Sequence, residues 1–295
     1  MAIGAAGRLY VVATPIGNLG DMSARARDTL QACVLIAAED TRHTGILLKH
    51  FGIQTPMLSL HDHNEPQRSK EIVQRLMGGD SIALVSDAGT PAISDPGFEL
   101  VRAAAAAGID VVAIPGPCAA IAALSIGALP TDRFCFEGFL PARGAARRKR
   151  LSILAGEPRT LVLYESPHRV REMLEDCALA FGGERSATVA REITKLHETI
   201  YRGSLQELAA RAGSDADFER GEIVLLIAGA PAPAPAADDG NDGDGHGGAL
   251  DRVLEALLKE LPLKQAARLA AQITGARDNQ AYKRALHLKQ ESGSQ

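Results

Sequence analysis

Residues Ser86–Gly97 read SDAGTPAISDPG and follow the apolar run IALV at residues 82–85. A short apolar run that ends in small residues, glycine, proline and aspartate predicts a buried strand opening into a turn, and a helical pattern resumes at Phe98. Glycine permits backbone angles that other residues avoid, and proline fixes its own. Because the carboxyl end of such a strand is where α/β proteins hold ligands, the stretch predicts a ligand-binding loop. A well-ordered connection without a ligand is the alternative.

The same pattern of strand and turn recurs on both sides of this loop. Further strands are predicted at residues 9–13, 34–37, 57–60 and 111–114. Helical patterns lie between them, and such alternation predicts a mostly parallel sheet covered by helices. Glycine-containing turns also follow two of these strands, at residues 14–20 and 114–118. We therefore expect three strand-end turns to line one crevice.

A second α/β domain and a helical tail complete the predicted organisation. Strands of the second domain are predicted near residues 134–137, 161–164, 188–191 and 223–228. Three helical patterns follow at residues 250–261, 263–273 and 279–288, and the short turn Thr274-Gly275 is compatible with a helix-turn-helix. The predicted boundaries are 1–117 and 118–230 for the two α/β domains, 231–248 for a flexible Ala/Pro and Asp/Gly linker, and 249–295 for the basic helical tail.

Composition places the chain among globular proteins. It has 295 residues, of which 46% are hydrophobic and 23% charged. Four separated cysteines, Cys33, Cys118, Cys135 and Cys177, form no CxxC pair, which favours reduced thiols over disulfides or zinc ligands. With neither a secretory signal nor a long apolar block, we expect a cytoplasmic protein without membrane contact.

The charge pattern argues for local nucleic-acid contacts at most. A net charge of −4 disfavours a protein that binds nucleic acid over its whole surface. Two basic segments remain, one at residues 143–150 and one in the tail, where eight Lys or Arg stand against five Asp or Glu from Ala249 onward. Each is either a phosphate-binding surface or a solvated helix face.

Two familiar nucleotide signatures are missing at the strand ends. No GxGxxG follows a predicted strand, and no GxxxxGK[ST] occurs. Exposed backbone N–H and C=O groups of the three turns would instead suit a polar, amino-acid-like ligand.

A series of motifs extends through both α/β domains. They read VVATPIGNLGD at 11–21, AEDTR at 38–42, LVSDAGTP at 84–91, ISDPG at 93–97, IPGP at 114–117, FEGFLP at 136–141, YESPHR at 164–169 and REITKLHE at 191–198. In this order they resemble the ribosomal small-subunit RNA 2′-O-methyltransferase I family. The resemblance covers roughly residues 8–229 and, more loosely, the basic tail.

The resemblance implies a two-domain α/β fold of the tetrapyrrole methylase-like superfamily, the class III S-adenosylmethionine methyltransferases, with a small helix-turn-helix-like C-terminal domain. It implies that S-adenosylmethionine binds between the two α/β domains. The implied reaction is methylation of the ribose 2′-hydroxyl of a cytidine in the decoding region of 16S rRNA, within the 30S subunit, by a homodimer. Since the methyl donor already has a sulfonium leaving group, alignment and proton removal suffice, and no metal is expected.

The expected donor-binding residues lie in the three strand-end turns. They are Thr14, Pro15, Gly17, Ser86, Asp87, Ala88, Gly89, Thr90, Pro115, Gly116, Pro117 and Cys118. In the superfamily the corresponding loops contact the donor largely through backbone. Ala228 and Gly229, after the last strand, are weaker candidates for the adenine end. Asp87 is either the acidic partner of the donor amine or a side chain that stabilises the loop.

Candidates for proton handling and RNA contact are charged residues of three other motifs. The catalytic candidates are Glu39, Asp40, Arg42, Glu192 and Lys195, with Glu165, Arg169 and Glu198 in the same motifs. A lysine beside carboxylates can have its pKa adjusted to help deprotonate a hydroxyl, but a solvated charged run is the alternative. The RNA-binding candidates are Arg143, Arg147, Arg148, Lys149 and Arg150.

Two other functions remain open at this point. One is methylation of a small tetrapyrrole in cobalamin or sirohaem synthesis, although a small ring needs neither basic segment. The other is a non-catalytic nucleic-acid binder whose C-terminal helices contact the partner, although such a protein would not need three glycine turns at strand ends.

Overall fold

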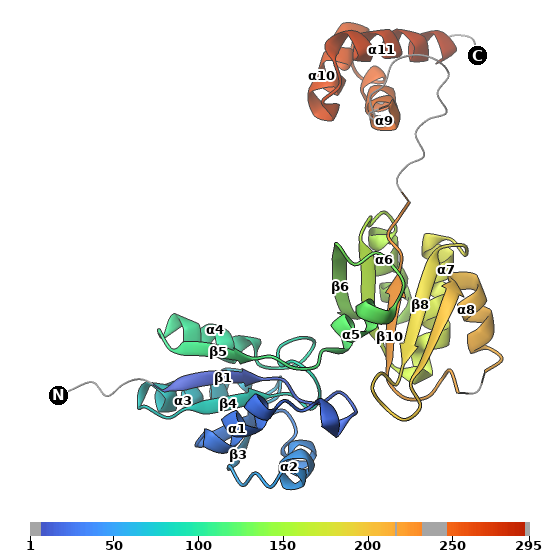
Figure 1. Ribbon diagram of the computed structural model, residues 1–295. Helices are drawn as coiled ribbons and strands as arrows, with labels where there is room; N and C mark the ends of the chain where they lie inside the picture. The colour runs from blue at the N-terminus through green and yellow to red at the C-terminus, as the bar shows by residue number, and fades with distance from the viewer. Residues whose placement is uncertain (1–6, 216, 232–246, 293–295) are drawn as a thin grey trace. The chain divides into compact units, whose positions relative to one another are not determined.

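The computed structural model describes residues 7–215, 217–231 and 247–292. The chain divides into two compact units, Met1–Ala230 and Pro231–Gln295, and we describe each by itself. The larger unit contains two five-stranded sheets, and the smaller unit contains helices (Figure 1). The predicted linker at 231–248 falls almost entirely on residues 232–246, which lie outside the described residues.

The first sheet is wholly parallel. Its strands are β1 (Arg8–Val12), β2 (Leu35–Ala38), β3 (Met57–Ser59), β4 (Ile82–Val85) and β5 (Asp110–Ile114), in the order β3-β2-β4-β1-β5. The helices between them are α1 (Ala24–Ala32), α2 (Thr41–His50), α3 (Glu65–Met77) and α4 (Phe98–Ala106), with the short 3₁₀ helix η1 at Leu19–Asp21. This confirms the predicted α/β alternation.

Helices bury both faces of this sheet, and successive strand residues contribute to opposite faces. On one face Ile36 and Val85 pack with Leu30 of α1. On the other face Leu84 packs with Ile72 of α3 and Leu100 of α4. The strand ends are thereby fixed on a rigid base.

The second sheet is mixed. Its strands are β6 (Phe134–Phe139), β7 (Thr160–Glu165), β8 (Ser186–Arg191), β9 (Thr199–Ser204) and β10 (Ile223–Ile227), in the order β6-β7-β10-β8-β9. Only β6 and β7 are parallel, whereas β10 runs antiparallel to both β7 and β8. Strand β9 is absent from the predicted strands, because its sequence TIYRGS has little apolar pattern and its hydrogen bonds to β8 define it.

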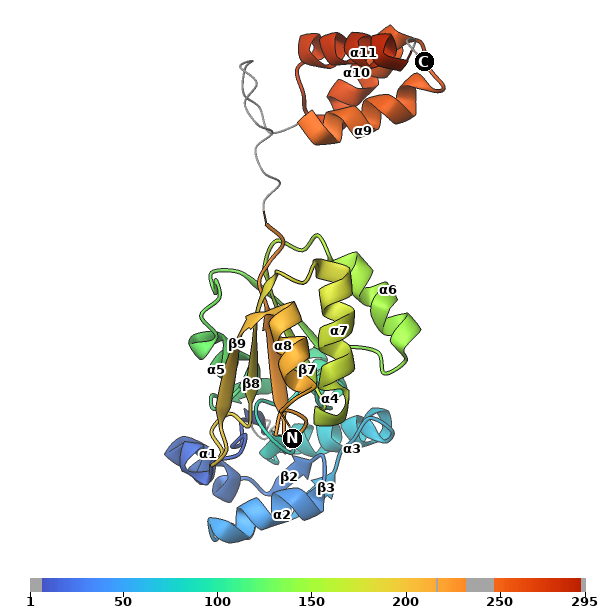
Figure 2. The ribbon, with the colours of Figure 1, turned by 90° about the vertical axis from the view of Figure 1, so that its right-hand side faces the viewer.

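Helices cover both faces of the second sheet (Figure 2). Helices α6 (Gly144–Leu154), α7 (Val170–Phe181) and α8 (Leu205–Ala212) contribute to a core on one face, and the 3₁₀ helix η2 (Pro167–Arg169) leads into α7. Helix α5 (Ala119–Ile126) packs on the other face against Val162, Ala190 and Leu226. Because α5 directly follows β5, it joins the two sheets at the end where the strand-end turns lie.

The smaller unit is a three-helix cluster of α9 (Gly247–Leu258), α10 (Leu263–Thr274) and α11 (Asp278–Ser292). Its core is built from Leu250, Leu254 and a set of alanines on α10 and α11. Gly275 ends α10 with a φ of 75°, a left-handed conformation that suits glycine and permits the predicted turn. Among the described residues, no helix combines the length and the apolar character needed to cross a bilayer.

Candidate active site

Hydrogen bonds join the three strand-end turns into one structure. The Thr14 N–H donates to the Gly89 carbonyl over 2.9 Å, and the Gly89 N–H returns a bond of 3.1 Å to the Thr14 carbonyl. The Thr90 hydroxyl donates to the Pro117 carbonyl over 3.0 Å. A Cβ at Gly116 would lie only 2.9 Å from the Ala13 Cβ, so the third turn needs glycine to approach the first. The structure thus brings together the three turns that the sequence predicts to line one crevice.

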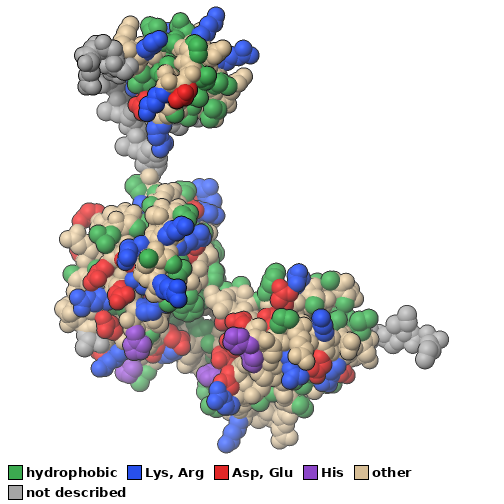
Figure 3. Space-filling view, turned by 180° about the vertical axis from the view of Figure 1, so that it is seen from behind, with side chains coloured by type: hydrophobic (Ala, Val, Ile, Leu, Met, Phe, Trp, Pro, Cys, Tyr) green, Lys and Arg blue, Asp and Glu red, His purple; other side chains and the backbone are tan. Residues whose placement is uncertain are grey.

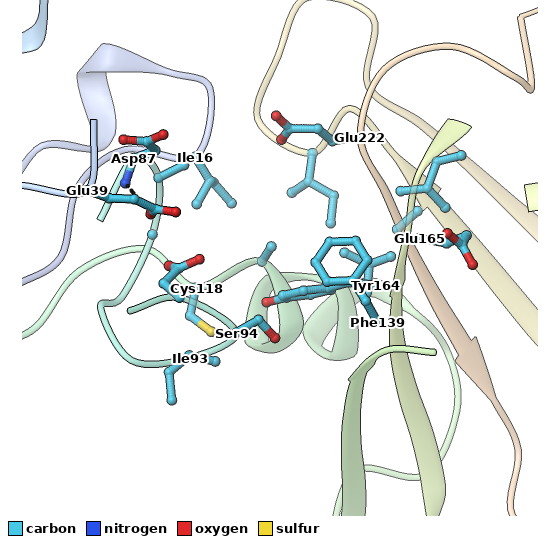
Figure 4. A pocket seen from close by; sticks show the side chains of 18 residues that line it. Ile16, Glu39, Asp87, Ile93, Ser94, Cys118, Phe139, Tyr164, Glu165 and Glu222 are labelled. Carbon is cyan, nitrogen blue, oxygen red and sulfur yellow. Dashed lines mark hydrogen bonds between the residues drawn. The ribbon is translucent and has the colours of Figure 1, made fainter. Parts of the chain in front are cut away.

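A cavity of about 260 Å³ lies between these turns and the second sheet (Figure 4). The first α/β domain lines it with Ile16, Glu39, Asp87, Ala88, Gly89, Ile93, Ser94 and Asp95. The segment that follows β5 contributes Cys118 and Ala119, and the second sheet contributes Phe139, Tyr164, Glu165, Ala190, Ile193, Glu222, Ile223 and Val224. The cavity is therefore shared between both sheets of the larger unit.

The lining of this cavity is acidic. Five carboxylates, Glu39, Asp87, Asp95, Glu165 and Glu222, line it, and no lysine or arginine does so among the described residues. The space-filling view shows acidic and histidine side chains beside the junction of the two α/β domains of the larger unit (Figure 3). Such a cavity favours a cationic ligand over an anionic one.

Glu39 and Asp87 are held together through the backbone. The Asp87 N–H donates to Glu39 Oε2 over 3.4 Å, and the Asp40 N–H donates to Asp87 Oδ1 over 3.0 Å. Burial raises the pKa of Glu39, the hydrogen bond from Asp87 lowers it, and the nearby negative charge of Asp95 raises it again. Because the net shift of the Glu39 pKa is upward, a nearby positive charge would stabilise the ionised form of this carboxylate.

Asp95 lies in a strained part of the loop after β4. The nearby residues Ala92 and Ser94 both have a φ of 67°, a backbone conformation that residues other than glycine rarely adopt. Burial is the main cause that raises the pKa of Asp95 to about 6, and the negative charges of Asp87 and Asp62 add to it. A hydrogen bond from Ser86 acts in the opposite direction and lowers the pKa. Asp95 therefore changes charge close to neutral pH.

The end of this loop is fixed by a buried glutamate of another helix. Glu65, at the start of α3, accepts hydrogen bonds at Oε1 from the N–H groups of Gly97, Glu99 and Leu100, over 2.9 to 3.2 Å. These N–H groups lie at the start of α4 and have no acceptor within the helix. A carboxylate at this position also compensates the helix dipole. Glu65 therefore caps α4 from outside and anchors the cavity loop.

Aromatic rings form the wall of the cavity on the second sheet. The Tyr164 hydroxyl accepts a hydrogen bond from the Ala120 N–H over 3.1 Å, which ties β7 to the start of α5. The rings of Phe136 and Phe139 meet the Tyr164 ring edge-on, with centroids 5.0 and 5.6 Å away. Burial raises the pKa of Tyr164, so its hydroxyl is neutral at physiological pH.

The buried Glu165 pairs with the partly exposed Arg169 beside this wall. Arg169 Nη2 donates to Glu165 Oε2 over 3.2 Å and to the Leu140 carbonyl over 3.0 Å. Burial raises the pKa of Glu165, and hydrogen bonds from Ser166 and the charge of Arg169 oppose this. The pair connects the ends of β6 and β7.

The segment 192–198 closes another side of the site. It forms turns and bends, and the positive φ of Glu192, 52°, belongs to that turn. Lys195 Nζ donates to Glu192 Oε1 over 2.9 Å and lies 3.2 Å from Glu222 Oε2. A Cβ at Gly17 would lie 2.4 Å from Lys195 Cγ, so the first strand-end turn packs directly on the lysine stem.

Burial lowers the pKa of Lys195, but the hydrogen bond to Glu192 and the charge of Glu222 outweigh this effect and raise it. For Glu192 burial raises the pKa, while the hydrogen bonds from Lys195 and from the Glu222 N–H lower it below its ordinary value. Lys195 is therefore a protonated donor in this arrangement, which does not fit the hypothesis of a lysine adjusted to act as a base.

The predicted donor residues fall into two groups. Asp87, Ala88, Gly89 and Cys118 line the cavity. Behind them, the buried residues Thr14, Pro15 and Ser86 support the turns. Thr90 supports them through its hydrogen bond to Pro117, and Gly116 through its close approach to Ala13. The neighbouring Pro115 and Pro117 belong to the same third turn, outside the lining.

Two predicted catalytic residues, Asp40 and Arg42, face away from the cavity lining. Asp40 Oδ1 accepts a hydrogen bond from the Arg42 N–H over 2.8 Å and caps α2. Arg42 Nη2 donates to Asp40 Oδ2 over 2.7 Å, and these bonds from Arg42 lower the pKa of Asp40 to about 2. Asp40 contributes to the site through its N–H group, which binds Asp87.

Ala228 and Gly229 lie at the wrong end of their strand. Strand β10 begins beside the cavity, where Ile223 pairs with Glu165 and Arg191, and then runs away from it. Five strand residues span about 17 Å. Ala228 and Gly229 therefore lie outside the lining of this cavity, because their strand runs antiparallel to its neighbours and ends away from it.

Arg147 is the other correction. Its side chain is only 3% exposed, and its Nε donates to Asp176 Oδ2 over 2.7 Å in the interface between α6 and α7. A phosphate cannot reach it, so the prediction of Arg147 as an RNA contact is wrong. Arg143, Arg148 and Lys149 are exposed on the same segment, and Arg150 pairs with Glu137 over 2.6 Å.

Several lining residues were missed by sequence reasoning. Asp95 lies within the stretch SDPG, where an acidic residue before proline was a usable signal. Tyr164 ends a predicted strand and Phe139 lies just beyond another, but aromatic residues at such places are equally typical of a core. Glu222 precedes β10, and only the antiparallel direction of that strand places it at the cavity.

Comparison with known proteins identifies the family. The model for tetrapyrrole (corrin/porphyrin) methylases matches residues 8–209, and the model for the RsmI C-terminal HTH domain matches residues 244–289. A protein of Pseudomonas aeruginosa named ribosomal RNA small subunit methyltransferase I is 54% identical over 97% of this chain and 99% of its own length. The protein of that name from Escherichia coli O157:H7 is 51% identical over 95% of both chains. The chain belongs to the ribosomal RNA small subunit methyltransferase I family.

Solved structures support the fold assignment. The cobalt precorrin-4 methyltransferase CbiF aligns with a TM-score of 0.57 and 18% identity, over 77% of this chain and 96% of that one. A uroporphyrin-III C-methyltransferase from Thermus thermophilus, complexed with S-adenosyl homocysteine, aligns with a TM-score of 0.53 and 16% identity, over 75% and 97%. At these identities the likeness shows the fold alone. The family resemblance and the two-domain methylase architecture with a helical C-terminal domain are confirmed for this chain.

Proposed function

We propose that this methyltransferase uses S-adenosylmethionine to methylate the ribose 2′-hydroxyl of a cytidine in the decoding region of 16S rRNA. The observation that carries the proposal is the acidic cavity at the joined strand ends, in a chain about half identical to proteins named ribosomal RNA small subunit methyltransferase I. We further propose that it acts on the 30S subunit in the cytoplasm, as a homodimer.

The residues of the cavity suit this donor. S-adenosylmethionine supplies an electrophilic methyl group on a positively charged sulfur, and its amino group adds a second positive charge. Glu39 and Asp87 offer paired carboxylates with a raised pKa at Glu39, and no basic side chain competes among the described lining residues. Backbone groups at Ala88, Gly89 and Cys118 offer further polar contacts. The donor set therefore fits a cationic amino-acid derivative.

We assign the removal of the hydroxyl proton to Asp95. It lines the cavity, and a pKa of about 6 makes it a stronger base than an ordinary aspartate while it stays largely ionised at pH 7. Glu39 and Asp87 then serve the donor, and Asp40 and Arg42 fix their position. Glu192 and Lys195 hold the turn beside the cavity, where the lysine ammonium pairs with Glu192 and Glu222.

The proposed RNA surface consists of Arg143, Arg148 and Lys149 beside α6, together with the basic tail. Their side chains are exposed and offer cations to phosphates, whereas the cavity itself repels them. This separation of an acidic cavity from a basic surface suits a reaction in which a cationic donor and a polyanionic substrate meet at one site.

Mass-spectrometric mapping of methyl groups in 16S rRNA tests the function. Purified 30S subunits that lack the modification are incubated with the protein and S-adenosylmethionine, and Gly116→Val provides a variant with a disrupted donor site. We expect one methylated cytidine ribose with the wild type and a strongly reduced amount with the variant. A methylated base, or no methylation of RNA together with methylation of a precorrin, would contradict the proposal.

A further inference from the structure

Strand β6 has an irregularity at the edge of the cavity. In its parallel pairing with β7, Phe136 pairs with Val162 and Gly138 with the next residue, Leu163, so Glu137 is an extra residue. Gly138 has a φ of 60°, a conformation that favours glycine. These are the features of a β-bulge, which changes the direction of the side chains that follow it.

The bulge decides where the ring of Phe139 points. In a regular strand, residues separated by three positions lie on opposite faces of the sheet. Here the rings of Phe136 and Phe139 both contact Tyr164, which lines the cavity. The bulge therefore brings Phe139 to the cavity side, as the close-up shows (Figure 4).

The bulge also lies close to the opposite wall of the cavity. A Cβ at Gly138 would lie 2.9 Å from the Ser94 hydroxyl oxygen, and Ser94 belongs to the strained loop that contains Asp95. Gly138, next to Phe139, thus packs closely against the loop that we assign to proton removal. Although it contacts Tyr164, the Phe139 side chain remains exposed, with 58% of its surface accessible.

We propose that Phe139 is the surface on which the base of the target nucleotide stacks while its ribose enters the cavity. This inference rests on the proposed function. A ribose reaches an enclosed cavity only when its nucleotide is turned out of the RNA stack, and such bases are commonly held against aromatic side chains. Every base has a π face, so this contact contributes binding and position rather than base identity.

The position of Phe139 favours the RNA base over the donor's adenine. The carboxylates proposed to bind the donor, Glu39 and Asp87, come from the first sheet, whereas Phe139 comes from the second sheet and is exposed at the edge of the cavity. A platform for an incoming nucleotide has to be accessible before the RNA arrives.

Substitutions of Phe139 test the stacking role. Phe139→Leu keeps an apolar side chain but removes the π face, whereas Phe139→Tyr keeps it. Phe98→Leu is the matched control, because Phe98 is 63% exposed at the start of α4 and does not line the cavity. We expect Phe139→Leu to lower kcat/KM for 30S subunits about 5- to 150-fold, with near-normal values for Phe139→Tyr and Phe98→Leu.

A fluorescence experiment observes the stacking itself. The chain has no tryptophan, so the substitution Phe139→Trp introduces a single reporter, and Phe98→Trp provides the control. The probe is a single-stranded RNA of the decoding-region sequence, compared with the same RNA in which the target cytidine is abasic. We expect the cytidine RNA to quench the indole fluorescence of the Phe139→Trp protein more strongly than the abasic RNA does. The two RNAs should affect the fluorescence of the Phe98→Trp protein equally, and the same result for the Phe139→Trp protein would contradict stacking.

The outcomes separate the two proposals. A wild-type protein that methylates no RNA ribose would overturn the proposed function and the stacking role with it. Normal wild-type ribose methylation together with wild-type kcat/KM in Phe139→Leu would overturn the stacking role alone. So would a weakened affinity for S-adenosylmethionine in calorimetry, which would assign Phe139 to the donor, or an altered oligomeric state, which would assign it to a subunit interface.

Discussion

Asp95 is the residue whose charge the structure ties most closely to pH. Its carboxyl has a pKa of about 6, so it is ionised above that pH and neutral below it. A cationic donor favours the ionised form, and binding below pH 6 must therefore release a proton. We expect the affinity for S-adenosylmethionine to fall by up to about tenfold per pH unit as the pH drops below 6.

Calorimetry between about pH 5 and pH 7 measures this dependence. The variant Asp95→Asn should bind the donor more weakly at pH 7 and with little change over the range. Asp110→Asn is the control, because Asp110 is a surface carboxylate that pairs with Arg8. An Asp95→Asn protein with the pH dependence of the wild type would contradict the assignment.

Gly116 is fixed by contact with short, immobile groups. Any side chain there meets the Ala13 Cβ at 2.9 Å and the Ala13 carbonyl oxygen at 3.4 Å. We expect Gly116→Val to lose about 1–3 kcal/mol of unfolding free energy and to bind the donor at least tenfold more weakly, because the first and third turns separate. Denaturant unfolding and calorimetry measure both effects.

The control for this substitution is Gly156→Ala, since a Cβ at Gly156 meets nothing within 4 Å. It should leave both quantities unchanged. Normal donor affinity in Gly116→Val would show that the contact between the turns does not shape the binding site.

At the scale of elements, the α3–α4 contact positions the loop after β4. Glu65→Ala leaves three N–H groups at the start of α4 without their acceptor. We expect a loss of about 2–4 kcal/mol in the free energy of unfolding, since a missing cap costs about 1 kcal/mol and buried unpaired donors add to it. Donor affinity should fall as well, because the loop containing Asp95 ends at this cap.

Glu71→Ala on the same helix is the control, since Glu71 makes only a surface ion pair with Arg68. Its free energy of unfolding should change by less than about 0.5 kcal/mol. Equal effects of the two substitutions would mean that Glu65 acts merely as a helical residue.

Helix α6 presents two neighbouring arginines with different roles. Arg147→Ala leaves Asp176 buried without its main partner and should destabilise the protein by about 3–5 kcal/mol. Arg148→Ala should leave stability nearly unchanged but weaken RNA binding and reduce the slope of log K against log salt by about 1.

Thermal unfolding and RNA binding at several salt concentrations compare the two variants. An Arg148→Ala protein with wild-type affinity and salt dependence would remove α6 from the proposed RNA surface. An Arg147→Ala protein of normal stability would contradict its structural role.

Some elements of the site could be predicted from the sequence and others could not. The turns after β1, β4 and β5 were predictable, because glycine and proline after short apolar runs define both the turn and the strand end. The direction of β10 was not, because periodicity shows that a strand is buried but not which way it runs. Ala228 was therefore placed at the site and Glu222 was missed.

Burial of a charged side chain is equally invisible in local sequence. Arg147 and Arg148 stand in the same basic run and both lie near Asp176, but the packing of α6 on α7 buries the Arg147 side chain and leaves that of Arg148 exposed. The bulge at Glu137 is a further example, because it depends on pairing with β7.

At the scale of the whole molecule, the two units allow their contributions to be separated. Residues 1–230 contain the cavity and its supporting cores, and residues 231–295 contain a core of their own. We expect deletion of residues 249–295 to leave donor affinity unchanged within about twofold and to weaken RNA binding at least tenfold, because the tail supplies an excess of positive charge.

Calorimetry with the donor and filter binding with 16S rRNA measure these two effects on the shortened chain. Loss of donor binding would show that the cavity depends on the tail. Unchanged RNA binding would restrict the RNA surface to the larger unit.

The measurement that tests the account most directly is a crystal structure with S-adenosylmethionine. We expect the donor in the cavity between the strand-end turns and the second sheet, with its positive groups toward Glu39 and Asp87 and its methyl group on the side of Asp95. A donor bound elsewhere, with this cavity empty, would contradict the central claim.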